Sequence, residues 1–316
     1  MEYGKYRFLI QLQEDAVLPY YKGSTFRGLF GHALRRVVCA LKHQECETCI
    51  LRPSCTYALV FETAAALPLP KGSRISAPPH PIVLEPPLTG KTCFKKGETM
   101  ACTLLLFGKI NKDLPYFVYA FDQMGEIGLG RKIKGKRSRF TLESVSTENE
   151  ILYEKNNKKI RFPENNEQIN CYNDNTSSDK GEAELQIEFK TPLRVKLDSH
   201  KLSLPFQFMI HTMIRRNTAL LNCYGSGEPD IDYPAMARRA AAVETVQENL
   251  TWFDWKRYSS RQDQKMFMGG ITGSVKYRGN LKEFIPMVEM AEKVHLGKNT
   301  FFGLGQICRK SVLIQK

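Results

Sequence analysis

Two parts of the chain repeat the same order of predicted elements, and this repeat limits the possible folds more than any other feature of the sequence. In each part an apolar strand is followed by a helix, a loop with several glycines and a strand that carries positive charge. In the first part these are residues 99–107, 115–124, 125–130 and 131–140, and in the second part residues 271–277, 281–294, 297–305 and the segment from Gln306. The repeat is one of pattern and not of identity, and it predicts duplicated β-α-β units of the ferredoxin-like kind.

A further strand and helix begin each half. Residues 6–12 and 184–195 have the aromatic, branched and alternating character of strands. Residues 26–38 and 206–224 carry apolar side chains at helical spacing, and residues 235–246 predict one more helix. A chain of 316 residues argues for about two domains. We therefore predict an α+β protein with two tandem ferredoxin-like (RRM-like) domains and glycine-rich loops.

The composition changes in the middle of the chain, where residues 143–182 are dense in Asn, Glu, Lys, Ser and Asp. This change predicts a linker or a hairpin at residues 146–182. The predicted N-terminal domain is then residues 1–145, with a cysteine-rich insertion. The predicted C-terminal domain is residues 183–316, with the second glycine-rich loop.

The charge balance favours a polyanionic partner. Lys and Arg number 46 against 33 Asp and Glu, which gives a formal net charge of +13. This excess favours phosphate-rich ligands, and a basic surface that serves only solubility is the alternative. The sequence has no run of about 18 apolar residues, and residues 1–5 lack the features of a signal peptide. We expect a cytoplasmic protein without a membrane partner.

Three segments are candidates for binding RNA, and they are the basic run at residues 131–139, residues 252–262 and residues 297–305. Residues 252–262 hold both tryptophans of the chain beside several cations, and aromatic faces stack on bases while cations bind phosphates. The glycines of residues 297–305 permit positive φ and exposed backbone N–H groups. The residues predicted to bind RNA are Arg131, Lys132, Lys134, Lys136, Arg257, Arg261, Lys298, Asn299, Gly303 and Gly305. The alternatives are a glycine turn that packs two elements, and aromatic side chains that belong to the core.

Four of the nine cysteines lie close together in the sequence, at Cys39, Cys46, Cys49 and Cys55. An odd total and no export signal argue against a disulfide framework. The Cys46-x2-Cys49 spacing is common in metal knuckles, and four thiolates complete a tetrahedral zinc site. The sequence therefore predicts a structural zinc, with an iron–sulfur cluster or reduced, partly buried thiols as alternatives.

A candidate catalytic group lies on the first predicted helix. Cleavage of RNA without a metal needs a base for the 2′-OH, an acid for the 5′-oxygen and a cation for the phosphate. His32 suits either proton transfer because its unperturbed pKa is near neutral. Lys22 and Arg36 are the predicted phosphate-stabilising cations, and Tyr21 is predicted to position a hydroxyl. The alternative is a surface or core histidine without a catalytic role.

Several of these motifs together resemble one branch of the CRISPR-associated pre-crRNA-processing endoribonucleases, in the repeat-associated mysterious protein (RAMP) superfamily. The resemblance rests on GSTFRGLFGHALRR, the four cysteines, YALVFE, WKRYSSRQDQKMFMGGITGSVKYRG and AEKVHLGKNTFFGLGQI, and covers most of the chain except residues 143–182.

The resemblance implies two ferredoxin-like domains and cleavage of CRISPR repeat RNA without a cofactor. The 2′-OH attacks the adjacent phosphate and leaves a 2′,3′-cyclic phosphate and a 5′-OH, and the mature crRNA passes to effector complex subunits. A histidine in or just after the first helix serves catalysis in such proteins, which carries over to His32. A non-catalytic RNA-binding subunit of a CRISPR effector complex is one alternative. A zinc or iron–sulfur protein with incidental RNA affinity is another.

Overall fold

A computed structural model describes residues 1–42, 44–73, 75–172, 182–196, 202–254, 256–259 and 264–314, with backbone only for 256–259, 264–267 and 311–314. The chain divides into two compact units. Unit 1 comprises Met1–Gln168 and Cys223–Gly225, and unit 2 comprises Ile169–Asn222 and Ser226–Lys316. No helix among these described residues has both the length and the apolar character of a membrane span.

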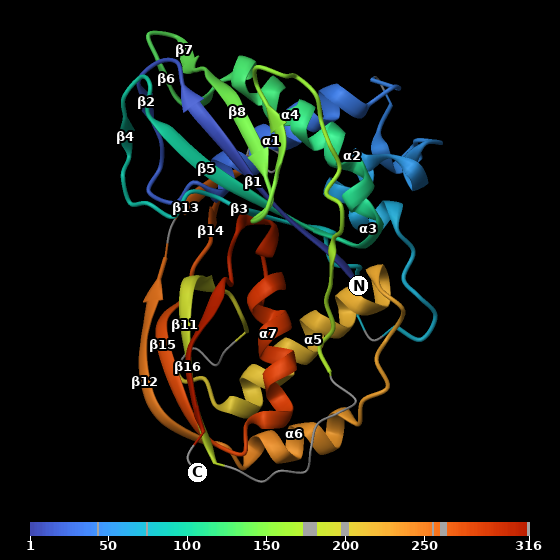
Figure 1. Cartoon of the computed structure of the whole chain (residues 1–316), viewed down its shortest axis with the longest axis vertical. Coiled ribbons are helices and arrows are strands. Elements are labelled where there is room, and N and C mark those ends of the chain that lie inside the picture. Colours follow the sequence, from blue (N-terminus) through green and yellow to red (C-terminus); the bar gives the residue numbers. More distant parts are fainter. Residues whose placement is uncertain are drawn as a thin grey trace. The chain divides into compact units, whose positions relative to one another are not determined.

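Unit 1 is built on an antiparallel sheet with two long helices (Figure 1). Its main elements, in chain order, are β1 (Glu2–Leu12), α1 (Gly23–Val38), β3 (Ile82–Glu85), β5 (Thr99–Phe107), α4 (Leu114–Ile127) and β8 (Phe140–Ser146). The strand order is β3-β5-β1-β8, extended by β9 (Ile151–Glu154), while β10 (Glu167–Gln168) also pairs with β1. This β-α-β-β-α-β connectivity agrees with the predicted ferredoxin-like pattern.

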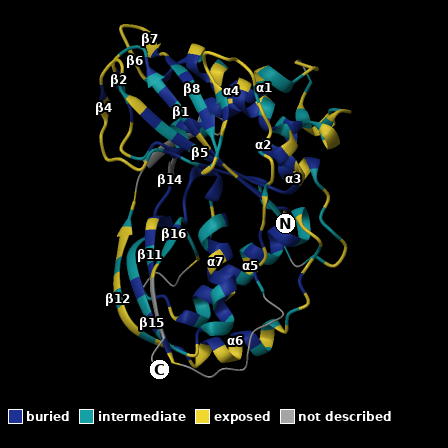
Figure 2. Cartoon of the chain, viewed as in Figure 1, coloured by how far each residue is buried: buried dark blue, intermediate teal, exposed yellow. Residues whose placement is uncertain are grey.

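The core of unit 1 lies between one face of the sheet and helices α1 and α4. Tyr6, Phe8 and Ile10 alternate along β1 and are fully buried, as Figure 2 shows for this layer. The Phe8 ring stacks on Phe121 of α4 with 4.2 Å between centroids, and Phe30 of α1 lies 5.5 Å from the same ring. The intervening β1 residues point to the opposite, open face of the sheet.

Shorter elements surround this frame. They are β2 (Ala16–Val17), η1 (Cys46–Thr48), η2 (Arg52–Ser54), α2 (Thr56–Phe61), α3 (Thr63–Ala66), β4 (Cys93–Phe94), η3 (Gly108–Asp113), β6 (Leu129–Ile133) and β7 (Lys136–Ser138). Strand β2 pairs with β4, and β6 pairs with β7 in a hairpin between α4 and β8.

Unit 2 repeats the same connectivity. Its main elements are β11 (Ala183–Leu193), α5 (Phe206–Tyr224), β12 (Glu244–Phe253), β15 (Gly270–Gly279), α7 (Ile285–Val294) and β16 (Ile307–Ile314). All pairs are antiparallel in the order β12-β15-β11-β16. The remaining elements are α6 (Tyr233–Ala241), β13 (Lys256–Ser259), β14 (Gln264–Phe267), η4 (Lys282–Phe284) and η5 (Thr300–Phe302). Phe206, Tyr277 and Phe284 form the aromatic centre of the core, with Phe206 4.9 and 5.1 Å from the other two rings.

Two predicted elements are wrong in part. The charged strand expected at residues 131–140 is instead the hairpin β6–β7, and the last strand of the β-α-β-β-α-β frame, β8, begins at Phe140. The helix expected at residues 235–246 ends at Ala241, and β12 begins at Glu244. Strand β12 lies at the edge of its sheet and exposes most of its side chains, so its sequence lacks the alternation of a half-buried strand. The predicted domain limits at 145 and 183 stay predictions. The compact units divide after Gln168, because β9 and β10 pair within the sheet of unit 1.

Candidate functional site

His32 lies on an exposed ridge of α1. Its side chain is exposed, as is that of Arg36 one turn further along the helix. One turn before His32 stands Gly28, where an added Cβ would meet no atom within 4 Å. A glycine inside a helix costs roughly 0.5–1 kcal/mol relative to alanine. Here it leaves open space beside the imidazole, so a bulky ligand can approach His32 closely.

Lys22 and Tyr21 do not accompany His32. Lys22 precedes the first turn of α1, and ten residues of helix separate it from His32 by roughly 15 Å along the axis. The Lys22 side chain is fully buried, and its Nζ donates to the carbonyl oxygens of Tyr20 at 3.1 Å and Thr89 at 2.6 Å. Burial lowers the pKa of Lys22. Burial, with the Glu85 carboxylate second, raises the pKa of Tyr21.

These contacts give Lys22 a structural role at the start of α1. The predicted pairing of Lys22 and Tyr21 with His32 in one catalytic group is therefore not found. Of the four predicted catalytic residues, the structure brings together only His32 and Arg36.

The basic run forms a hairpin, β6–β7. Lys134 and Gly135 make its two-residue turn, with φ of 49° and 83°, and two positive φ values are the signature of the type I′ turn that matches strand twist. The exposed cations of the hairpin are Arg131, Lys132, Lys134, Lys136 and Arg137. Within the described part of the chain none of these five forms an ion pair. The hairpin is therefore a concentrated positive surface.

The base of this hairpin is anchored to the segment that contains β2. Ser138 donates from its hydroxyl to the Asp15 carbonyl, and the Arg139 N–H donates to the Glu14 carboxylate at 2.7 Å. At Gly130 an added Cβ would lie 2.5 Å from the Val17 carbonyl oxygen. The close approach at Gly130 requires glycine, so the hairpin projects from a fixed base.

The C-terminal glycine loop is packed into unit 2, which corrects the prediction that it exposes backbone N–H groups. Gly303 and Gly305 are buried. The Gly303 N–H donates to the Thr300 carbonyl at 2.8 Å, and the Gly305 N–H donates to the Pro192 carbonyl at 3.0 Å. Both glycines have positive φ, at 81° and 74°. Their N–H groups are thus engaged inside the protein, and the glycines serve packing.

The outer part of the loop carries two predicted RNA-binding residues, and these differ in their exposure to solvent. Lys298 is exposed, while Asn299 is half-buried in a left-handed conformation with φ of 63°. The Asn299 amide donates to the Met268 sulfur at 3.5 Å. Lys298 is therefore the loop residue best placed to reach an anion.

Two residues fix this loop from within the unit, and the sequence analysis gave neither of them this role. Thr191 on β11 is buried, donates to the Gly303 carbonyl at 2.8 Å and accepts from the Gln306 N–H at 2.9 Å. His295 is buried, and its Nδ1 lies 3.1 Å from the Leu304 carbonyl oxygen. A hydroxyl at an otherwise apolar strand position was the only available sequence signal for Thr191.

The aromatic segment is only partly described. Trp252 on β12 is 54% exposed, which suits stacking on a base. Arg257 lies on β13, whose backbone alone is described, and Arg261 lies outside the described residues. The RNA-binding roles of Arg257 and Arg261 remain predictions.

The cysteine-rich insertion brings some thiols near one another without forming a metal shell. Burial raises the pKa of Cys46; the Arg35 guanidinium opposes this shift, while Cys55 and Cys39 add to it. Among the described residues, which include all four cysteines, no three His, Cys, Asp or Glu side chains are arranged to hold a metal. The positions of these thiols therefore give no support to a metal site, and the metal remains a prediction.

Known protein families match segments of both units. A family model described as an N-terminal domain matches residues 1–165, and the model of the CRISPR-associated endoribonuclease Cas6 family matches residues 187–307. A protein of Archaeoglobus fulgidus described as uncharacterised is 27% identical over 294 residues, with 91% of each chain covered.

Solved structures support the fold. A Cas6 product complex matches with a TM-score of 0.54 at 15% identity, over 97% of this chain and 100% of that chain. A chain of a partial Cas6-RT-Cas1–Cas2 complex matches with a TM-score of 0.56 at 11% identity, over 98% of this chain and 46% of that chain. At these identities the likeness concerns the arrangement of helices and strands.

Proposed function

We propose that this chain, whose residues 187–307 match the model of the CRISPR-associated endoribonuclease Cas6 family, cuts CRISPR repeat RNA without a metal, with His32 as the proton-transfer group. The proposed tandem ferredoxin-like frame presents α1 on unit 1 and the glycine loop on unit 2. The observation that carries the proposal is the exposed ridge of α1, where His32 lies between Gly28 and Arg36.

The proposed reaction is an internal transesterification. The 2′-oxygen forms a bond to phosphorus, the bond from phosphorus to the 5′-oxygen breaks, and the products are a 2′,3′-cyclic phosphate and a 5′-OH. His32 either removes the proton of the 2′-OH or supplies one to the leaving 5′-oxygen, with water as the second proton carrier. Arg36 carries a positive charge on the same ridge, and a cation there stabilises the doubly charged phosphorane.

Binding of the RNA is proposed to rest on separate positive surfaces. The β6–β7 hairpin offers Arg131, Lys132, Lys134 and Lys136, and the glycine loop offers Lys298. Each phosphate contact contributes about 0.7 to the log–log salt slope for binding of single-stranded RNA. Replacing these four of the five hairpin cations with glutamine is therefore expected to flatten the slope by about 3. A matched control replaces Lys71, Lys109, Lys112 and Lys159, which are also exposed. An equal effect of both sets would refute a specific hairpin contact.

Catalysis is tested by His32→Ala in single-turnover cleavage of repeat RNA in EDTA. We expect the rate to fall by about 10²–10⁴-fold with RNA affinity retained. The control is His211→Ala, because His211 is an exposed helix histidine of unit 2. Mapping of product ends distinguishes the proposed chemistry from metal-dependent hydrolysis, since only the former leaves a 2′,3′-cyclic phosphate.

The alternative function is that of a non-catalytic RNA-binding subunit. Wild-type protein that binds repeat RNA in EDTA and never cuts it would support this alternative and reject the role of His32. Under either function we propose a cytoplasmic protein that hands its RNA to other CRISPR subunits.

A structural metal at Cys39, Cys46, Cys49 and Cys55 is kept as a separate proposal. Its support is the Cys46-x2-Cys49 spacing and the mutual influence of three of the thiols. The protein, purified without added metal, is expected to contain about one zinc per chain. Iron with visible absorbance would indicate a cluster instead, and no metal by elemental analysis would reject both.

A further inference from the structure

The open faces of the two sheets each carry a polar hollow, and the two hollows occupy equivalent positions in the repeated fold. In unit 1 the hollow has a volume of about 440 Å³ and is lined by Lys5, Arg7, Thr103, Ser146, Thr147 and Glu148. In unit 2 it has a volume of about 460 Å³ and is lined by Gln186, Glu188, Phe189, Gly273, Ser274 and Lys310. Each is formed by the first, third and fourth strands of its unit, or by the residues that directly follow them.

Arg7 is the central group of the unit 1 hollow. It is exposed on β1, directly opposite Thr103 of β5 on one side and Ser146 of β8 on the other. Directly opposed side chains in a sheet have Cβ atoms about 4.5–5.5 Å apart. No hydrogen bond or ion pair of the Arg7 guanidinium is found within the described residues, nor any of the Thr103 and Ser146 hydroxyls. An uncommitted guanidinium is thus flanked by two uncommitted hydroxyls.

The rim of this hollow does not cancel the charge of Arg7. Glu148 is the one carboxylate among the lining residues, and it pairs with Lys5 at 2.8 Å. Both members of the pair are exposed, at 48% and 75% of their side chains, so water weakens the interaction. With two cations and one carboxylate, the hollow keeps one positive charge, centred on Arg7.

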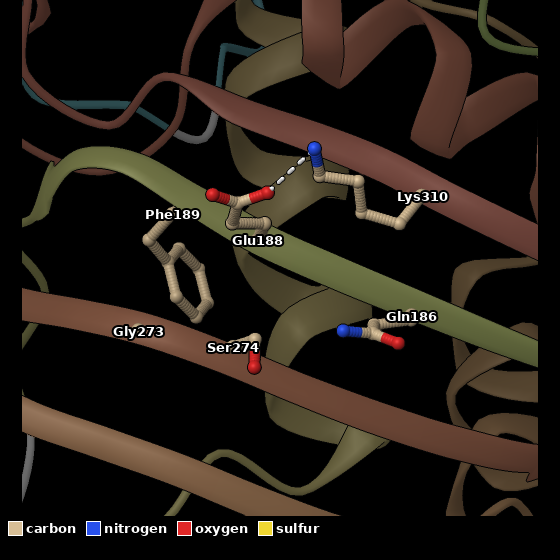
Figure 3. A pocket seen from close by; sticks show the side chains of 6 residues that line it. All are labelled: Gln186, Glu188, Phe189, Gly273, Ser274 and Lys310. Atoms are coloured by element: carbon tan, nitrogen blue, oxygen red, sulfur yellow. Dashed lines mark ion pairs between the residues drawn. The ribbon is translucent and has the colours of Figure 1, made fainter.

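The unit 2 hollow is lined by one cation and one carboxylate, and these two groups form an ion pair. Lys310 is the only cation among its lining residues, and its Nζ lies 3.0 Å from the Glu188 carboxylate, as Figure 3 shows. Glu188 also accepts a second cation, Lys190, at 2.9 Å. Lys310 is therefore engaged in an ion pair, whereas Arg7 forms none with any residue that the structure describes. Lys310 lines the equivalent hollow, on the fourth strand of its unit instead of the first, and so serves as a control cation that is already paired.

We propose that the Arg7 hollow binds one phosphate of the RNA backbone, an inference that rests on the proposed function and adds a contact on the open face of unit 1. The planar guanidinium fork matches two phosphate oxygens, and hydroxyl groups of Thr and Ser commonly donate to phosphates. No aromatic side chain is among the lining residues, so the hollow lacks a platform for stacking a base. Phosphate recognition is the chemistry that remains.

The test measures binding of a fully 2′-O-methylated repeat RNA, which has no 2′-OH nucleophile, as a function of salt. Arg7→Gln is expected to flatten the log–log slope by about 0.7 and to weaken binding roughly tenfold at low salt. Arg7→Lys keeps the charge and is expected to retain the slope while losing part of the affinity. Lys310→Gln is expected to leave both quantities unchanged.

Three results separate the outcomes. A slope for Arg7→Gln equal to that of wild type would overturn the phosphate contact and leave the proposed function standing. A wild-type protein that fails to bind the repeat RNA at all would reject the proposed function itself. An inorganic phosphate-induced rise in melting temperature that disappears in Arg7→Gln, together with an unchanged RNA slope, would assign the hollow to free phosphate and overturn the RNA contact.

The Arg7 side chain makes no hydrogen bond or ion pair among the described residues, so Arg7→Gln is expected to melt at the wild-type temperature. Should it fail to fold, the double variant Thr103→Val and Ser146→Ala tests the same hollow. Loss of affinity there supports the contact, and wild-type affinity rejects it.

Discussion

Gly305→Ala is the substitution that separates the packing role of the C-terminal loop from a binding role. Gly305 has φ of 74°, and an alanine Cβ would lie 1.8 Å from the Leu296 carbonyl oxygen. Its N–H donates to Pro192 at 3.0 Å, and its carbonyl accepts from the Leu296 N–H at 2.9 Å. The left-handed conformation costs an alanine about 1–2 kcal/mol. The shift that relieves the clash also weakens two backbone hydrogen bonds, each worth about 1 kcal/mol.

We therefore expect Gly305→Ala to lower the free energy of unfolding of unit 2 by about 3–4 kcal/mol. The control is Gly227→Ala in the same unit, where φ is 118° and an added Cβ would meet no atom within 4 Å. Backbone strain alone predicts a loss there of about 1–2 kcal/mol. Urea unfolding followed by tryptophan fluorescence reports on unit 2, because both tryptophans of the chain belong to it.

The reasoning fails if Gly305→Ala is no more destabilising than Gly227→Ala. A Gly305→Ala protein with wild-type stability but no RNA binding would refute it in a second way. That result would mean that the glycine serves approach of a ligand and not packing.

Three further substitutions test other parts of the argument. Lys22→Met leaves the Tyr20 and Thr89 carbonyls without their donor, so we expect the free energy of unfolding to fall by about 1–3 kcal/mol. The single-turnover cleavage rate is expected to stay at the wild-type value. A hundredfold slower rate in the folded variant would restore Lys22 to the catalytic group. Gly28→Ala is expected to stabilise α1 by roughly 0.5–1 kcal/mol. Gly28→Gln is expected to slow cleavage, because its side chain fills the space beside His32. Equal cleavage rates for the wild type and both variants would show that this space is not used. Burial raises the pKa of the Cys171 thiol to about 11, so the folded state holds the thiol proton more tightly than the unfolded state does. The free energy of unfolding is therefore expected to fall between pH about 8.5 and 11, by at most roughly 3 kcal/mol. Urea unfolding at pH 8 and pH 10.5 measures this loss, and Cys171→Ala should show a smaller one, whereas an unchanged pH dependence would contradict the assignment.

Predictions that depended on local pattern agree with the structure. The strand at residues 99–107 and the helix at residues 206–224 have the predicted limits, because apolar spacing and flanking breakers define them locally. The exposed position of His32 likewise follows from the amphipathic spacing of α1, whose apolar stripe includes Phe26 and Phe30. In these cases the neighbours within one element decide the environment of a residue.

Predictions that depended on distant contacts were less successful. The burial of Lys22 is decided by Thr89, 67 residues away in the sequence. The N–H of Gly305 is engaged by Pro192, from a strand more than a hundred residues earlier. The glycines of the loop indicated positive φ, which the structure confirms. Positive φ occurs in an exposed loop and in a packed loop alike, so it does not distinguish the two. Only the partner of the N–H distinguishes them, and that partner is a tertiary feature.

The two units show how one connection can diverge after duplication of a fold. In each, the helix before the last strand ends at a residue with positive φ, Gly128 after α4 and His295 after α7. Glycine adopts this conformation without strain, whereas His295, with φ of 59° and ψ of 157°, adopts it at a cost of about 1–3 kcal/mol. The hydrogen bond from the buried His295 ring to Leu304 offsets that cost and holds the loop closed. The corresponding segment of unit 1 has no such bond among its described residues and opens into the β6–β7 hairpin, whose cations face solvent. The same junction thus supplies a closed, packed loop in one unit and a projecting cationic surface in the other, so loss of the hairpin charges should affect RNA binding without affecting stability.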